Sequence, residues 1–107
     1  MDELERVLYV NNLFQLYGNL LSNAQKEIIL DYYEYNLSLS EIAENRNTSR
    51  SAVEDALKKG VKKLEQIEEE LKINQRNNEL RKLVEKIKST SDENKKNQLL
   101  NELERMI

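Results

Sequence analysis

The chain has 107 residues, and its 17 basic and 20 acidic side chains give a formal net charge of −3. This length supports one small domain with at most a helical appendage. Cysteine and histidine are both absent, which excludes disulfides and thiolate metal sites and removes the commonest general base and metal ligand. The sequence also has no glycine-rich phosphate loop, so we predict a protein without metal, cofactor or enzymatic activity.

The composition predicts an all-α protein. Charged residues make up 35% of the chain, glycine occurs only twice and proline is absent, which is typical of helices with little sheet. No apolar run approaches the ~18 residues that span a bilayer, and the N-terminal stretch MDELERVLYVNN is acidic where a signal peptide is basic. We therefore expect a cytoplasmic protein with no membrane insertion.

Charge is distributed unevenly along the chain. Residues 1–37 carry six acidic and two basic side chains, a net charge of −4. Residues 76–96 carry seven basic and four acidic side chains, a net charge of +3. Because phosphates attract positive charge, we expect attraction to nucleic acid late in the chain rather than early.

Two helices are predicted in the first third of the chain. Leucines and aromatic residues recur every three or four positions, which indicates an amphipathic helix over about residues 3–21 with an interruption near Gly18. Ser22 followed by Gln25 forms a capping box, which opens a second helix that runs to about Tyr35.

A cluster of tyrosines ends this second helix: Tyr32, Tyr33 and Tyr35. Such a cluster can serve as a stacking platform for bases. Tyrosines at helical spacing next to Ile28 and Ile29 more often lie in the core with the hydroxyl group at the surface, and we prefer that interpretation.

A short helix and a tight turn follow. A second capping box, Ser38 with Glu41, starts the short helix. Asn47 is expected to adopt the left-handed conformation of a tight turn, because its short polar side chain tolerates positive φ. Thr48 or Ser49 then caps the next helix, and this spacing is typical of a helix-turn-helix motif.

A long helix with a heptad seam is predicted from Val53 onward. Its apolar positions step by four and three: Val53, Leu57, Gly60, Leu64, Ile67 and Leu71. We expect five side chains to be buried: Val53, Ala56, Leu57, Val61 and Leu64. The far half of the seam needs a cover, which the C-terminal segment or a second copy of the chain would supply.

The C-terminal segment is predicted to be helical after a polar joint, NQRNN, at residues 74–78. Apolar residues define one face with Leu80, Leu83, Val84 and Ile87, and a later face with Leu99, Leu100, Leu103, Met106 and Ile107. Two short helices, or one helix broken near Ser89 to Ser91, both fit this pattern. The expected cover for Leu64, Ile67 and Leu71 is Leu80, Val84, Ile87 and the last helix, or the same surface of a partner chain in a homodimer.

These elements predict a helix-turn-helix domain over residues 1–73 and a C-terminal helical extension over residues 74–107. The domain is expected to have a three- to four-helix core with a long recognition helix. Two positions depart from the usual motif, because Arg46 and Thr48 stand where an apolar residue normally fills the space between the helices.

The stretch LLSNAQKEIILDYYEYNLSLSEIAENRNTSRSAVEDALKKGVKKLEQ resembles region 4 of bacterial sigma factors. The shared features are the L-S-x-x-Q opening, the L-S-x-x-E-I-A helix and the T-S-R-x-x-V turn. With its leader NNLFQLYGNLL, the chain is more closely similar to YlxM-type proteins of low-GC bacteria over residues 11–73. That resemblance implies a cytoplasmic helix-turn-helix protein that acts in, or regulates, the signal recognition particle pathway.

Three function classes can be compared on these residues. A DNA-binding protein or sigma-like transcription regulator would use the start of the recognition helix: Ser49, Arg50, Ser51, Glu54, Asp55, Lys58 and Lys62. Glu54 and Asp55 are expected to face outward and repel phosphates, and residues 37–60 carry four acidic and four basic side chains. The third class, an enzyme, has almost no support from the residues of the sequence.

The second class is a protein- or RNA-binding helical module, with signal recognition particle RNA or protein as its partner. It would use the basic C-terminal segment, with Lys82, Lys86 and Lys88 at its centre. These lysines could equally balance neighbouring glutamates at helical spacing. Our hypothesis is therefore a DNA-binding or regulatory accessory protein of the signal recognition type.

Overall fold

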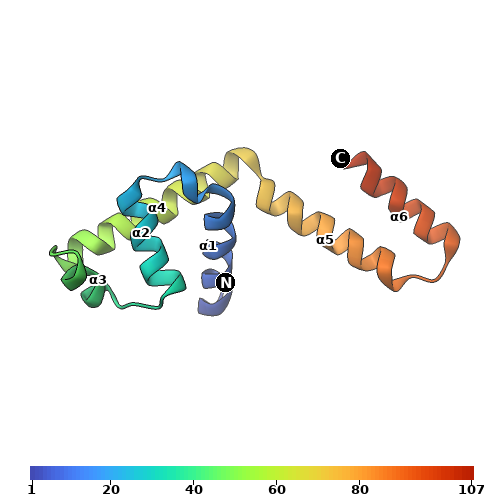
Figure 1. Ribbon diagram of the computed structural model, residues 1–107. Helices are drawn as coiled ribbons and strands as arrows, with labels where there is room; N and C mark the ends of the chain where they lie inside the picture. The colour runs from blue at the N-terminus through green and yellow to red at the C-terminus, as the bar shows by residue number, and fades with distance from the viewer. The chain divides into compact units, whose positions relative to one another are not determined.

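The computed structural model describes residues 1–107, and it consists of helices joined by short turns, with no strand (Figure 1). The elements are α1 (Glu3–Tyr17), η1 (Gly18–Leu20), α2 (Asn23–Ile29), η2 (Leu30–Glu34), α3 (Leu39–Asn45), α4 (Arg50–Leu71), α5 (Ile73–Ser89) and α6 (Glu93–Arg105). The all-α prediction is confirmed. The chain divides into two compact units, Met1–Lys72 and Ile73–Ile107.

Both predicted capping boxes are present. The Ser22 hydroxyl accepts from the Gln25 backbone N–H, and the Gln25 side chain accepts from the Ser22 N–H, each at 3.2 Å. Ser38 and Glu41 make the same reciprocal pair at 3.1 Å each. These contacts satisfy N–H groups that a helix start leaves without an intrahelical partner, so α2 and α3 begin where the local sequence predicts.

The second helix does not run as one regular α-helix to Tyr35. After Ile29 it widens into the π-helical segment η2, in which the Tyr35 N–H donates to the Leu30 carbonyl at 3.0 Å. Asn36 then ends the segment with a left-handed φ of 56°. A polar, short side chain tolerates this conformation.

The tyrosines divide between core and surface. Tyr32 and Tyr33 are partly buried against the core, with ring centroids 5.0 Å apart and planes at 78°, an edge-to-face pair. Tyr35 is exposed. The core interpretation therefore holds for the first two tyrosines and is wrong for the third, because the wider turn of η2 carries Tyr35 away from the core.

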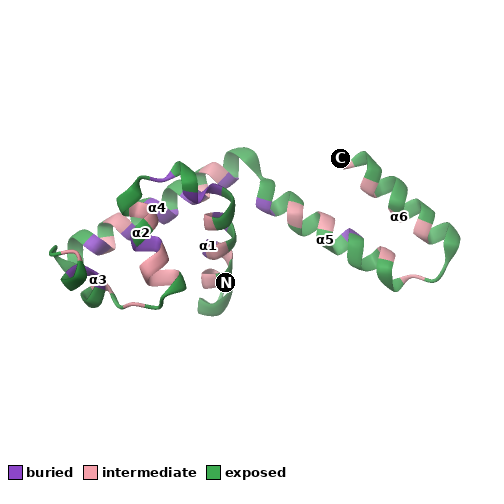
Figure 2. Ribbon diagram, in the orientation of Figure 1, coloured by how far each residue is buried: buried purple, intermediate pink, exposed green.

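The core of the first unit is a single cluster to which α1, α2, α3 and α4 all contribute (Figure 2). Its buried members are Val10, Leu13, Tyr17, Leu21, Ile28, Ile29, Ile42, Ala43, Val53, Leu57, Val61 and Leu64. Four of the five predicted α4 residues are among them, while Ala56 is only partly buried. Gly60 permits close packing of α4 on α2, because a Cβ at that position would lie 2.9 Å from Ile29 Cδ1.

The far half of the α4 seam differs from the prediction. Leu64 is fully buried in the core cluster of the first unit, to which α1 contributes. Leu71 is 56% exposed. The buried position one turn before it is Glu68, whose carboxylate accepts from the Tyr17 hydroxyl at 2.6 Å. The seam therefore ends in a polar contact that the heptad pattern did not predict.

The joint predicted at residues 74–78 is also wrong. Helix α4 ends at Leu71, and its C-cap residue Lys72 has a left-handed φ of 56° and donates its N–H to the Glu68 carbonyl at 2.7 Å. Helix α5 begins at the next residue, so the whole NQRNN stretch is helical. A single left-handed residue is sufficient to end a helix, and no polar linker is required.

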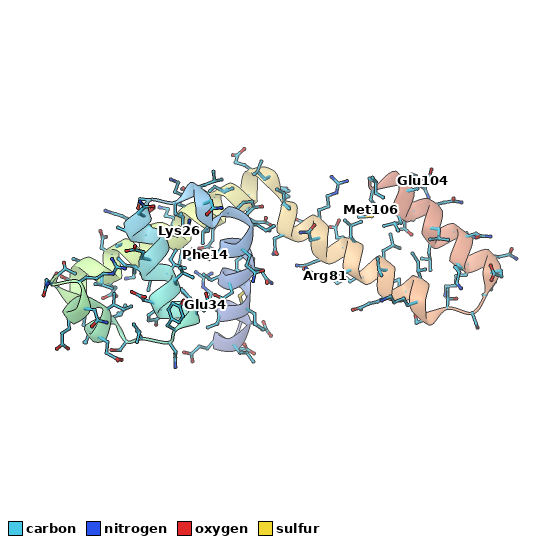
Figure 3. The ribbon with its side chains drawn as sticks, viewed as in Figure 1. Phe14, Lys26, Glu34, Arg81, Glu104 and Met106 are labelled. Atoms are coloured by element: carbon cyan, nitrogen blue, oxygen red, sulfur yellow. The ribbon has the colours of Figure 1, made fainter.

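The second unit is a helical hairpin in which α5 packs against α6. The Asp92 carboxylate caps α6 by accepting from the N–H groups of Asn94 and Lys95 at 3.0 and 3.4 Å. The C-terminal segment therefore consists of two separate helices, the first of the two predicted alternatives. Leu83 is the one buried apolar side chain of this unit. Met106 is half-buried and Glu104 is exposed. Figure 3 labels both side chains near the C-terminal end of α6.

Candidate nucleic-acid interface

Helices α3 and α4 form the predicted helix-turn-helix. Ile42 and Ala43 of α3 and Val53 of α4 are buried together, which holds the two helices at the turn. Asn47 has the expected left-handed φ of 52°, and the Thr48 N–H donates to the Ala43 carbonyl at 3.0 Å. The turn is therefore closed by backbone contacts.

Arg46 replaces the usual apolar contact with an ionic one. Its guanidinium lies 2.9 Å from Glu27 Oε2 and 3.5 Å from Asp31 Oδ2, and so joins the end of α3 to α2 and η2. The Arg46 Nε is buried without a hydrogen-bond partner. Arg46 is thus committed to the scaffold and contributes little positive charge to the exposed face of the motif.

The first turn of α4 is capped by Ser49. Its hydroxyl accepts from the Ala52 backbone N–H at 3.1 Å and lies 3.3 Å from the Ser51 hydroxyl. Arg50 and Ser51, the first residues of the helix, are exposed. Ser49 therefore positions the helix start, and the two residues after it are accessible.

The outward stripe of α4 is defined by Ser51, Asp55, Lys58 and Lys62, all exposed and spaced three or four residues apart. Lys58 Nζ lies 3.2 Å from Glu54 Oε1, and Lys59 Nζ lies 2.9 Å from Asp55 Oδ2. Each carboxylate is therefore paired with a lysine one turn later, which reduces the repulsion expected from Glu54 and Asp55.

Glu54 does not share the fully outward position of Asp55. It is half-buried and lines a cleft of about 280 Å³ between the helices. The other lining residues are Arg6, Tyr32, Tyr33, Leu39, Leu57, Lys58, Val61 and Glu65. Glu54 is therefore less exposed than Asp55, although both are expected to face outward, because residues of α1 and η2 line the same cleft.

The walls of the cleft are held by an ion pair. Both terminal nitrogens of the Arg6 guanidinium lie 3.3 Å from the Glu65 carboxylate, and this hydrogen bonding raises the pKa of Arg6. Burial raises the pKa of the Tyr33 hydroxyl, which also lines the cleft. No sequence pattern predicts this cleft, since it combines residues from α1, η2, α3 and α4.

The N-terminal part of α4 has a net positive charge. From residue 50 to residue 63 the helix carries two acidic residues and five basic ones, a net charge of +3, and all five basic side chains are exposed: Arg50, Lys58, Lys59, Lys62 and Lys63. Lys59 and Lys63 were missed as candidates, although each lies one residue after a predicted one. The balance expected over residues 37–60 differs for two reasons: that range includes Arg46, Glu41 and Glu44, which do not lie on α4, and it stops before Lys62 and Lys63.

The three lysines predicted on the C-terminal segment are all exposed on α5 and form no ion pair. Lys82 and Lys86 lie one turn apart on the same side. Lys88 lies about 200° further around the helix axis, where it shares a shallow surface groove with Arg81 and Glu85. The structure therefore brings two of these lysines together and separates the third.

No helix of the chain combines the length and the apolar character that crossing a membrane requires. No cluster of carboxylates with the arrangement of a metal site occurs either.

Comparison with known proteins identifies the family. Residues 4–104 match the UPF0122 family, described as "Putative helix-turn-helix protein, YlxM / p13 like". A UPF0122 protein of Malacoplasma penetrans is 46% identical over 78 residues, which cover 73% of this chain and 72% of the relative. A UPF0122 protein of Fusobacterium nucleatum is 46% identical over 72 residues, 67% of this chain and 70% of the relative. The chain therefore belongs to the UPF0122 family of YlxM-like helix-turn-helix proteins.

Proposed function

We propose that this protein is a regulatory DNA-binding protein that places the first half of α4 in the major groove of duplex DNA. The observation that carries the proposal is the exposed, net positive face of α4 directly after a capped helix-turn-helix turn. A helix in this position reads base edges with its N-terminal residues, while basic side chains contact the phosphates.

Several residues near the start of α4 have a chemical role in this proposal. Arg50 and Lys62 contact phosphates or guanine, and Ser51 donates to a phosphate or a base edge. Asp55 accepts from cytosine N4, which turns an unfavourable charge into a specificity contact. Glu54 contributes less to repulsion than a fully exposed carboxylate, because it lines the cleft.

The two lysine–carboxylate pairs do not prevent this use of α4. Exposed ion pairs contribute only about 0–1 kcal/mol each, so Lys58 and Lys59 can exchange a carboxylate for a phosphate at low cost. Release of counterions from the duplex then drives binding.

Substitution of both Lys58 and Lys62 by glutamine is expected to weaken duplex DNA binding and to flatten its salt dependence. Each lost phosphate contact lowers the slope of log K against log salt by about 0.9. Asp55→Asn is expected to tighten nonspecific binding, because it removes a charge that repels phosphates. Fluorescence anisotropy at several salt concentrations measures both effects, and Lys95→Gln on α6 is the matched control.

The DNA proposal fails if the wild-type chain does not bind duplex DNA at low salt. It also fails if the Lys58→Gln/Lys62→Gln variant keeps the wild-type slope. Retained helix content in circular dichroism shows that the variant is folded.

A second candidate, association with RNA, is favoured by α5. From Arg76 to Lys88 this helix carries five basic and two acidic side chains, a net charge of +3, and Lys82, Lys86 and Lys88 are exposed without ion pairs. Together with the resemblance to YlxM-type proteins, this supports a role as an accessory protein of the signal recognition particle. The partner would be the RNA or a protein of that particle.

Substitution of Lys82, Lys86 and Lys88 by glutamine separates the two candidates. If α5 binds structured RNA, this variant loses RNA affinity and its salt slope falls by about 0.7–0.9 per lost contact, while the Lys58→Gln/Lys62→Gln variant keeps RNA affinity. Capture of partners from a lysate with and without nuclease is a second measurement. Partners that persist after nuclease, with no RNA binding by the purified chain, would contradict the RNA candidate.

A further inference from the structure

The cleft that Glu54 lines, here the first cleft, has a neighbour of similar size. This second cleft has a volume of about 320 Å³, and its lining comes from α1, η2, α3 and the turn between η2 and α3: Glu3, Val7, Tyr32, Tyr33, Asn36, Leu37, Ser38 and Glu41. Tyr32 and Tyr33 line both clefts. The two clefts therefore adjoin at this edge-to-face pair, and together they are called the tyrosine groove below.

The two tyrosines lie in a segment of unusual backbone. Both belong to the π-helical segment η2, and both rings are only partly buried. Single π-helical turns are rare and frequently occur at functional sites. A tyrosine ring that is partly accessible can pack against an apolar side chain and attract a cation to its face. The pair is therefore suited to contact a ligand that combines the two.

The lining of the tyrosine groove has an excess of negative charge. The two basic residues of the first cleft, Arg6 and Lys58, already pair with carboxylates on its walls. The second cleft has no basic residue, and its Glu3 and Glu41 form no ion pair. Residues 1–72 as a whole carry fourteen acidic and nine basic side chains, a net charge of −5. Both the groove and the unit around it therefore favour a cationic ligand.

We propose that the tyrosine groove binds a basic peptide segment of a partner protein. An arginine or lysine of that segment enters the second cleft, where Glu3 and Glu41 accept charge-assisted hydrogen bonds and a tyrosine ring supplies a cation–π contact. A neighbouring apolar side chain enters the first cleft, whose apolar lining includes Leu39, Leu57 and Val61. Because a cavity of about 150 Å³ already holds benzene, each cleft has room for such a side chain.

Charge argues against a nucleic acid in this groove. Its phosphates would meet the unpaired carboxylates of Glu3 and Glu41, which repel them. The inference does not depend on the proposed function, since Lys58 is the one residue that the groove shares with the outward stripe of α4. The experiment below contains no nucleic acid, so its failure is distinct from a failure of the DNA proposal.

Titration of the full chain with a synthetic peptide in which leucine and arginine alternate with alanine tests the groove. Amide NMR shifts of the ¹⁵N-labelled chain should change at the residues that line the two clefts, Tyr32 and Tyr33 included. Calorimetry at two salt concentrations measures the dissociation constant, which should rise with salt because the attraction is ionic. A control peptide with glutamate in place of each arginine should not bind.

The variant Glu3→Gln/Glu41→Gln tests the role of the two carboxylates. Glutamine at position 41 can still accept from the Ser38 N–H in the capping box, so circular dichroism should show unchanged helix content. Loss of two exposed ion pairs with the ligand should raise the dissociation constant of the arginine peptide about 5-fold. The matched control, Glu5→Gln/Glu44→Gln, removes two exposed charges of α1 and α3 that lie outside the groove, and should change it less than about 2-fold, because salt screens exposed charges at a distance.

Binding of the arginine peptide without shifts at the lining residues would overturn the proposal, as would the absence of binding. Equal effects of the two double variants would also contradict it, since general attraction to an acidic chain would then explain the affinity. Sedimentation of the chain alone covers the remaining occupant. A wild-type dimer that Glu3→Gln/Glu41→Gln dissociates would mean that a basic helix of a second copy, and not a partner protein, fills the groove.

Discussion

Replacing Leu64 with alanine is expected to lower the free energy of unfolding by about 2–5 kcal/mol, the usual range for a fully buried leucine. Leu64 is 0% exposed and packs in the cluster formed with Val10, Leu13 and Tyr17. The alanine would leave a cavity between α1 and α4, since the backbones of two helices relax only partly. Urea denaturation followed by circular dichroism measures the change.

Leu71→Ala is the matched control on the same helix. Leu71 is predominantly solvent-exposed, so its truncation should change stability by no more than about 0.5 kcal/mol, as for other surface substitutions. Equal losses at both positions would contradict the structure. They would mean that the whole heptad seam is covered, as its sequence pattern alone predicts.

The signals that predicted the fold correctly are local ones. Ser22 and Ser38 each have their capping partner three residues away, and Asn47 supplies the left-handed turn within the motif itself. Contacts of this kind depend on neighbouring residues. For that reason the starts of α2, α3 and α4 could be predicted from the sequence.

The sequence-based predictions are wrong where contacts between residues far apart in the chain determine the structure. The heptad pattern could not show that α1 covers Leu64, or that Tyr17 would make Glu68 a buried position. The polar NQRNN stretch predicts a joint because it lacks apolar residues. The helix instead breaks at Lys72, where one residue adopts a left-handed conformation.

The same distinction applies to the candidate interface. Helical periodicity alone places Ser51, Asp55, Lys58 and Lys62 on one stripe, and all four are exposed. It could not show that Glu54 lines a cleft, because the walls come from α1 and η2. Nor could it show that Arg46 is held by Glu27 and Asp31, which alters the charge balance of the motif.

A large difference in folding is expected when the two units are produced as separate fragments. Residues 1–72 contain the entire core cluster, so this fragment should unfold in one cooperative transition. Residues 73–107 contain one buried apolar side chain, Leu83. Chains below about 40 residues usually need a disulfide, a metal or a partner to fold, and isolated short helices are marginal in water.

The fragment of residues 73–107 should therefore show low helix content alone and no cooperative thermal transition by circular dichroism. Since α5 carries a net positive charge, added structured RNA is a direct test of whether a partner restores the helices. Addition of residues 1–72 is the matched protein control. A cooperative transition in 73–107 that does not depend on its concentration would contradict the prediction, because half-buried residues such as Leu80 and Leu99 would then suffice as a core. If helix content instead rises with concentration, the fragment folds by self-association, and its exposed leucine Leu100 becomes the position to substitute.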